Sequence, residues 1–512
     1  MSQVDAADTA PRMIRSLFRS ALAASSTAIA LAVVVPTAPV TAQSAAQAPY
    51  EDSLSAAEAR ADIAALYDTM QAEHVDLFAR RTRAEYDAKI GEIAARIDGP
   101  IARSAFHRMV QEALAFGRVG HAKSDAPFLD VMTHVQEGGT IIPLSVTYRG
   151  EAMLTDQWAS EGDAMPPGSR VMRLDGLTLA EFERRARKLV SADTDRLPRA
   201  QIELGLPAYL FLVFGPRDTL EIEFIAPDGR QESRAIPARG FGEMYALQAA
   251  RPVPNASRHA SMRAFEDVGG GVFYIKPGPF FATEEERGEG GETYAIEPYR
   301  AFVREAFAAL ADSAAKDLVI DLRGNPGGDA SFSDLVVGRV ADRPFAQSSR
   351  YELRAGPNTK AAWAQREPKG DGLGARIADA LARAEPGERI AIEVPEAPPI
   401  ADNAFSGRVF VLVDRHSYSN AAVVAAMMQD LGLATIMGEE TADLATTYGA
   451  TETFTLPASG VKVIYPKAFM VRPSGSLAVR GVVPDFAIQP NPVGAAEDRM
   501  LDTALTQIRL TR

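Results

Sequence analysis

Apolar residues in the first part of the chain recur every three or four positions, the spacing of one helix face. The first such stretch follows Ser55 and Glu58, whose three-residue separation is typical of a capping box at a helix start. Gly117 and Gly120 end the pattern just before His121. About three helices are predicted here, over the stretches 63–70, 86–97 and 101–116.

From residue 140 to about 237 the apolar runs become short and are broken by Pro-Gly and Asp-Gly turns, which predicts a small β-rich module. Residues 167–176, Pro-Gly-Ser-Arg-Val-Met-Arg-Leu-Asp-Gly, resemble the segment of PDZ domains that precedes their short helix. Relative to a minimal PDZ domain, 186–216 would be an insertion. Strands are expected at 141–146, 169–174 and 219–225.

After residue 270 strand and helix patterns alternate, which is typical of an α/β layered domain. The acidic, glycine-rich stretch 284–292 is expected to be a mobile surface loop. The predicted fold class is therefore α/β and multidomain. Strands are expected at 271–275, 318–322, 409–413 and 434–437, a hairpin at 454–456 and 461–465, and helices at 299–314, 421–431 and after Gly494.

The N-terminus has the composition of an export signal. Three arginines precede an uncharged stretch over 21–35, and small residues follow at 40–42. The apolar segment is shorter than the roughly 20 residues that span a bilayer, so cleavage near Gln43 is favoured over a membrane anchor. A periplasmic or secreted protein with no stable membrane span after signal cleavage is expected.

The composition excludes some classes of function. The net charge is −13 and no basic run could follow a phosphate backbone, which argues against nucleic-acid binding. The chain has no cysteine, so disulfides, thiolate metal sites and a cysteine nucleophile are excluded. No metal or cofactor is predicted.

The segment most informative about chemistry is 409–422, where an apolar strand leads into a polar turn and then into a helix of small residues. Ser419 lies just before that helix, where backbone N–H groups carry partial positive charge and a serine nucleophile is commonly presented. The alternative is that Ser417 or Ser419 is only a helix N-cap.

A second segment, 318–328, is a buried strand followed by the turn Arg-Gly-Asn-Pro-Gly-Gly. The N–H of Gly327 or Gly328, together with that of Asn420, could stabilise an oxyanion, a contribution of roughly 3 kcal/mol per donor. A plain turn without a ligand is the alternative. A phosphate loop is disfavoured because the Lys-Ser/Thr pair that should follow is absent.

These two segments resemble motifs of the S41 serine peptidases, the family of C-terminal processing proteases and tricorn. Residues 321–328 resemble the motif that supplies the oxyanion glycine, and 417–422 the nucleophile motif, with Ser419 in the serine position. Gly481-Val-Val-Pro-Asp485 is similar to the closing motif. The resemblance implies a ClpP/crotonase-like catalytic domain.

The general base is the point at which this sequence departs from one branch of the family. The position of the processing-protease lysine is Leu444. In the tricorn-like branch a Gly-His-Thr motif supplies a histidine, and Gly120-His121-Ala122 resembles it, which implies His121 as base; an imidazole suits this role because its unperturbed pKa lies near neutrality. His416 is the competitor, being three residues from Ser419.

The third, orienting carboxylate is not identified by its usual position, because Ala478 stands where tricorn-like members have glutamate. Glu452, Glu439 and Asp485 remain as candidates, and a Ser–His dyad without a third member is the alternative.

The expected function is an exported serine peptidase that acts on peptides or unfolded proteins. The alternatives are a catalytically impaired, peptide-binding pseudo-peptidase, and a hydrolase of another acyl substrate or a CoA-binding protein; the last is disfavoured because no basic patch for adenosine phosphate is present. The expected parts are a signal peptide (1–42), an N-terminal helical domain carrying His121 (43–125), the PDZ-like module (126–240), the catalytic domain (255–490) and a C-terminal helix (491–512).

Overall fold

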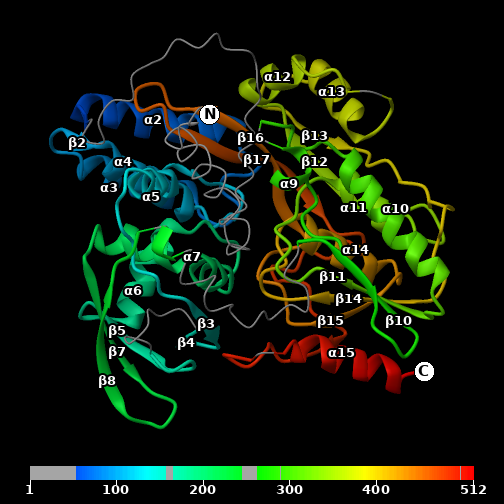
Figure 1. Ribbon diagram of the computed structural model, residues 1–512. Coiled ribbons are helices and arrows are strands. Elements are labelled where there is room, and N and C mark those ends of the chain that lie inside the picture. Colours follow the sequence, from blue (N-terminus) through cyan, green and yellow to red (C-terminus); the bar gives the residue numbers. More distant parts are fainter. Residues whose placement is uncertain are drawn as a thin grey trace, which may run out of the picture.

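The computed structural model describes residues 53–156, 165–240, 242–244, 262–288, 290–368, 370–495 and 497–512 (Figure 1). The export signal expected over 1–42 lies outside these residues. Within the part of the chain that is described, no helix has the length and apolar character needed to cross a membrane.

The N-terminal region contains the three predicted helices. The first begins with the predicted capping box: the Glu58 N–H donates to Ser55 Oγ, and the Ser55 N–H donates to the Glu58 carboxylate at 2.9 Å. Thr82 and Glu85 form the same box at the second helix. The elements are β1 (Ser53–Leu54), α2 (Ala56–Glu73), α3 (Arg83–Ala95), β2 (Ile101–Ala102), α4 (Arg103–Phe116) and α5 (Ala126–Gln136).

The β-rich module forms a sheet of order β3-β4-β5-β7-β8, with β6 paired to β5. The prediction of a strand over 141–146 is wrong: Ile141 forms only an isolated bridge to Arg239, and the strand begins at Val146. The elements are β3 (Val146–Arg149), β4 (Ala152–Thr155), β5 (Arg170–Leu174), β6 (Leu177–Thr178), α6 (Leu179–Ala186), the 3₁₀ helix η1 (Arg187–Leu189), α7 (Leu197–Phe214), β7 (Thr219–Ile225) and β8 (Gln231–Pro237).

The predicted α/β domain is present, with a central sheet of order β18-β15-β14-β11-β10-β9. All neighbours are parallel except β9 and β10. Alternate strand residues enter separate cores on the two faces, as a parallel sheet covered on both sides requires. The strands are β9 (Ala264–Asp267), β10 (Val272–Lys276), β11 (Asp317–Asp321), β14 (Arg408–Val413), β15 (Thr435–Gly438) and β18 (Phe486–Ala487); the helices are α10 (Glu297–Asp312), α11 (Ala330–Val337), α14 (Asn420–Asp430) and α15 (Arg499–Leu510).

A second, antiparallel sheet of order β13-β12-β17-β16 extends from this domain, and its last two strands are longer than the predicted hairpin. The stretch 284–292 is not simply a loop, because α9 (Glu284–Arg287) forms there with a Thr283–Glu286 capping box. The remaining elements are β12 (Arg350–Arg354), α12 (Pro357–Ala364), α13 (Leu373–Arg383), β13 (Arg389–Ile392), β16 (Thr447–Thr455) and β17 (Lys462–Val471).

The N-terminal helices share their core with the hairpin β16–β17, which Figure 1 shows in orange reaching toward the blue helices. Asp62, buried on α2, accepts hydrogen bonds from the N–H groups of Ala458 (3.0 Å) and Ser459 (2.7 Å) in the hairpin turn. Lys123 forms a backbone bridge with Ile464. These contacts fix the loop that follows α4 against the catalytic domain.

Candidate active site

Ser419 lies at the turn between β14 and α14, at the carboxyl edge of the central sheet. Its φ of 53° and ψ of −125° are rarely adopted by a residue with a side chain, a strain found mainly at functional positions. Its hydroxyl makes no capping bond to α14, so the N-cap alternative does not account for it. Ser417, by contrast, donates its hydroxyl to the Leu322 carbonyl at 2.7 Å.

His121 lies in the loop after α4, and its Nε2 is 3.2 Å from Ser419 Oγ. The imidazole stacks on the Tyr418 ring with a centroid distance of 5.4 Å and an interplanar angle of 23°. The competitor His416 is directed elsewhere, with Nε2 3.7 Å from Glu203 Oε2. The structure therefore brings together a hydroxyl and an imidazole that lie 298 positions apart in sequence.

Burial determines the protonation state of His121. Desolvation lowers its pKa to about 4, while the charge of Asp193 and the backbone carbonyl of Tyr448 partly oppose this. The Nδ1 atom of His121 is buried, and no described residue lies in hydrogen-bonding geometry with it. At neutral pH the imidazole is uncharged and able to accept a proton, but the imidazolium would be poorly compensated.

The glycine turn after β11 packs directly against the serine. A Cβ at Gly327 would lie 2.8 Å from Ser419 Cβ and 2.7 Å from the Asn420 nitrogen, so only glycine fits there. Its N–H donates to Asn325 Oδ1 at 2.8 Å, so Gly327 is not an available oxyanion donor. The backbone N–H groups of Gly328 and Asn420 have no acceptor within the described part of the chain.

The three candidate third carboxylates are occupied elsewhere. Glu452 binds Arg366 at 2.7 and 2.8 Å and Lys467 at 3.1 Å, and Glu439 pairs with Arg415 at 3.0 Å. Asp485 accepts from Gln429 and from the Ile436 N–H. Among the described residues none of the three forms a hydrogen bond or ion pair with His121.

Two other carboxylates, which the sequence reasoning missed, flank the Ser–His pair. Asp193 accepts from the Gly120 N–H at 2.6 Å, and Asp443 accepts from the Ser419 N–H at 2.7 Å. Burial raises the pKa of each to about 6. No sequence signal marks either residue, because neither belongs to a motif. Across the described ranges, no three or more His, Asp or Glu side chains form a group that could hold a metal ion.

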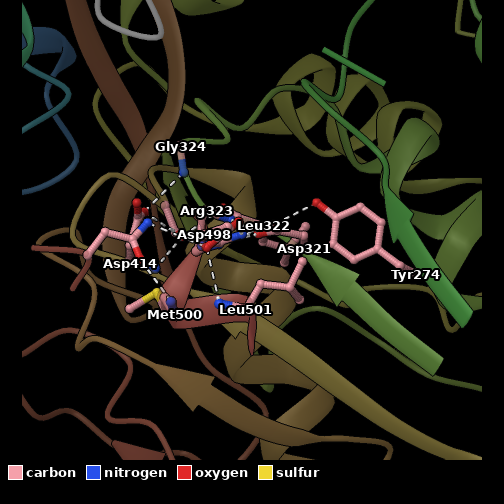
Figure 2. A network of polar contacts seen from close by, with 11 residues as sticks. Tyr274, Asp321, Leu322, Arg323, Gly324, Asp414, Asp498, Met500 and Leu501 are labelled. Carbon is pink, nitrogen blue, oxygen red and sulfur yellow. Dashed lines mark hydrogen bonds and ion pairs between the residues drawn. The ribbon is translucent and has the colours of Figure 1, made fainter. Parts of the chain in front are cut away.

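The start of the glycine turn, directly after β11, is held by an ion-pair network, shown in Figure 2. Arg323 donates to the Asp321 carboxylate and, with both terminal nitrogens at 2.7 Å, to Asp498 at the start of α15. Tyr274 donates its hydroxyl to Asp321 at 2.7 Å. The Gly324 N–H donates to Asp414 on the loop after β14 at 3.0 Å. The network fixes both loops that meet at Ser419.

Together these elements define a mixed α/β protein with a serine and a histidine in contact at the carboxyl edge of a parallel sheet. The family model of peptidase family S41 matches residues 293–488, the part of the chain that includes the glycine turn and Ser419. Serine-type hydrolysis is the kind of reaction that this family performs.

Solved structures resemble the chain in fold at low sequence identity. Mature CPAF complexed with lactacystin has a TM-score of 0.61 at 11% identity, over 89% of this chain and 98% of that chain. Mature CPAF alone has a TM-score of 0.59 at 12% identity, over 89% and 96%. The photosystem II D1 C-terminal processing protease has a TM-score of 0.44 at 15% identity, over 87% and 97%. Comparison with curated protein sequences finds no match.

Proposed function

We propose that the protein is an exported serine peptidase that cleaves peptides or unfolded proteins, with Ser419 as nucleophile and His121 as general base. The observation that carries the proposal is the 3.2 Å contact between His121 Nε2 and Ser419 Oγ. This distance is close to the range required for proton transfer in a Ser–His pair. The match to peptidase family S41 supports peptide bonds as the class of substrate.

In this mechanism Ser419 Oγ transfers its proton to His121 Nε2 and attacks the scissile carbonyl carbon. The developing oxyanion accepts hydrogen bonds from the N–H groups of Asn420 and Gly328, which have no other acceptor in the described structure. The imidazolium then protonates the leaving amine. Water repeats the sequence to release the acyl group from Ser419.

The test is covalent labelling with a fluorophosphonate, followed by mass spectrometry of the labelled peptide. Wild type is expected to be labelled on Ser419, and Ser419→Ala to lose both label and peptide cleavage. Ser417→Ala is the matched control, because Ser417 Oγ is bonded to the Leu322 carbonyl and should not react. Cleavage should also survive a chelator. Labelling of another serine in Ser419→Ala would overturn the assignment.

A second candidate function is a peptide-binding pseudo-peptidase. It is favoured by Leu444 and Ala478, which stand where family members have the base lysine and the orienting glutamate. Such a protein would bind peptides but form no fluorophosphonate adduct, so the same experiment separates the two functions.

A further inference from the structure

The segment between η1 and α7, which belongs to the β-rich module, braces the loop that carries His121. Ser191 Oγ donates to the Ala122 carbonyl. Gln111 on α4 donates to the Leu189 carbonyl at 3.1 Å and to Ser191 Oγ at 3.2 Å. Thr194 Oγ1 donates to the Ala442 carbonyl at 2.8 Å. One short segment therefore contacts both the histidine loop and the loop next to the nucleophile.

Asp193 lies in the middle of this segment and is 3% exposed. Its Oδ2 accepts the Gly120 N–H at 2.6 Å, one residue before His121. A Cβ at Gly120 would lie 2.8 Å from that oxygen, so the absence of a side chain at Gly120 permits the close approach. Oδ1 is buried with no partner among the described residues. A buried carboxylate oxygen left without a partner is costly, which points to a use other than packing.

Asp443 has the corresponding place beside the nucleophile. It is fully buried, its Oδ2 accepts the Ser419 N–H, and its Oδ1 also has no partner within the described ranges. Its charge raises the pKa of Asp193, so the two carboxyls influence each other electrostatically. The bond to the Ser419 N–H also helps to hold the serine in its strained backbone conformation.

We propose that Asp193 is the positioning carboxylate of His121, supplied by the β-rich module in place of the glutamate that is missing at Ala478. It acts by fixing the backbone at Gly120 and by compensating the charge of the imidazolium that forms during the reaction. Asp443 holds the Ser419 turn through its hydrogen bond from the Ser419 N–H. The inference rests on the proposed function, and it makes the β-rich module part of the active site.

The first experiment compares peptide hydrolysis by wild type, Asp193→Asn and Asp195→Asn. The asparagine keeps an acceptor for the Gly120 N–H but removes the charge, so kcat should fall by roughly 10- to 100-fold with KM nearly unchanged. Asp195→Asn is the matched control, because Asp195 is 85% exposed and pairs with Arg118 on the surface. It should retain wild-type kcat. Equal kcat in wild type and Asp193→Asn would overturn the proposal.

The second experiment requires no turnover. The titration of His121 is followed by NMR, with its signal assigned by comparison with His121→Gln among the six histidines of the chain. In wild type the His121 signal should respond to the titration of the Asp193 carboxyl at about pH 6, a step that should be lost in Asp193→Asn and kept in Asp195→Asn.

The two experiments separate the two claims. Wild type that neither cleaves peptides nor reacts with fluorophosphonate would end the proposed function, while the titration would still decide whether Asp193 acts on His121. An unchanged His121 titration in Asp193→Asn would overturn the inference even in an active enzyme. If Asp193→Asn fails to fold, Asp193→Glu serves instead: it keeps the charge but moves it, so kcat should fall while the His121 signal still responds to titration of the carboxyl.

Discussion

Two groups of buried carboxylates, one at the start of the glycine turn and one beside the Ser–His pair, differ in how their negative charge is compensated. At the turn that follows β11, burial alone would raise the pKa of Asp321, but the charge and hydrogen bonds of Arg323 outweigh it and lower that pKa. Beside Ser419, neither Asp443 nor Asp193 forms an ion pair with a described residue, and burial raises their pKa values to about 6. The carboxylates of the first group are paired with an arginine, whereas each carboxylate of the second keeps one oxygen without a partner among the described residues.

The difference separates what holds the site from what performs its chemistry. The network of Arg323 satisfies its charges, fixes α15 to the sheet and gives the turn a rigid base (Figure 2). Asp193 and Asp443 each keep one buried oxygen that has no partner among the described residues, at a cost in stability. Such local costs are expected where a function requires them.

The largest effect on stability should come from Arg323→Leu. The substitution leaves Asp321 and Asp498 buried without their cation, which typically costs about 3–5 kcal/mol in the free energy of unfolding. The midpoint of denaturant unfolding measures it. Arg230→Leu is the control, because that arginine is paired with Asp228 on the surface and its loss should change little. A loss below about 1 kcal/mol for Arg323→Leu would remove the contrast between the two groups.

The next effect has the opposite sign: Asp443→Asn should stabilise the fold while lowering kcat. The raised pKa, from 3.8 to about 6, corresponds to a penalty of roughly 3 kcal/mol when the carboxylate is ionised. Asparagine keeps an acceptor for the Ser419 N–H, so we expect a gain of about 1–3 kcal/mol in unfolding free energy at pH 7.

The pH dependence of the unfolding free energy provides a second test of the Asp443 carboxyl. Because the folded-state pKa of Asp443 is raised, the folded state binds the proton more tightly, and this group's penalty develops as pH rises from about 4 to 6. In Asp443→Asn the fall in stability across that window should be smaller than in wild type. Destabilisation of the variant at pH 7 would mean that Asp443 is only a structural acceptor.

The smallest effect is expected for Thr194→Val, which removes the hydrogen bond to the Ala442 carbonyl and the acceptor for the Leu197 N–H at 3.1 Å. The cost should be about 1 kcal/mol in unfolding free energy. Since Asp193 stays in place, kcat should change by only about two-fold, well below the loss in Asp193→Asn. A loss of kcat as large as that of Asp193→Asn would assign the effect to the segment's position rather than to the carboxylate.

Local patterns predicted much of the fold. The capping box at Ser55 and Glu58, the three N-terminal helices and the alternating strands and helices after residue 270 are present. Two elements differ from the prediction: the strand expected at 141–146 begins at Val146, and the acidic stretch 284–292 contains a short helix whose Glu286 pairs with Arg263. Ile141 pairs instead with Arg239, which is distant in sequence, whereas the short helix has a local Thr283–Glu286 capping box that the prediction of a loop overlooked.

The residues of the candidate site likewise fall into those that the sequence identified and those that only the structure revealed. Ser419 and the glycines stand in recognisable motifs, and His121 was selected by resemblance. The occupied N–H of Gly327 and the partners of Glu452 are visible only in three dimensions. Asp193 was placed in an expected insertion of the β-rich module, where no pattern sets it apart from other acidic residues.

The sequence by itself determined which elements form and which residues have reactive side chains, because capping, periodicity and turn chemistry act over a few neighbouring positions. Only the tertiary structure decided which of those side chains meet. Contact between His121, Ser419 and Asp193 depends on three regions sharing buried surfaces, and the charge state of each group depends on how far those surfaces exclude water.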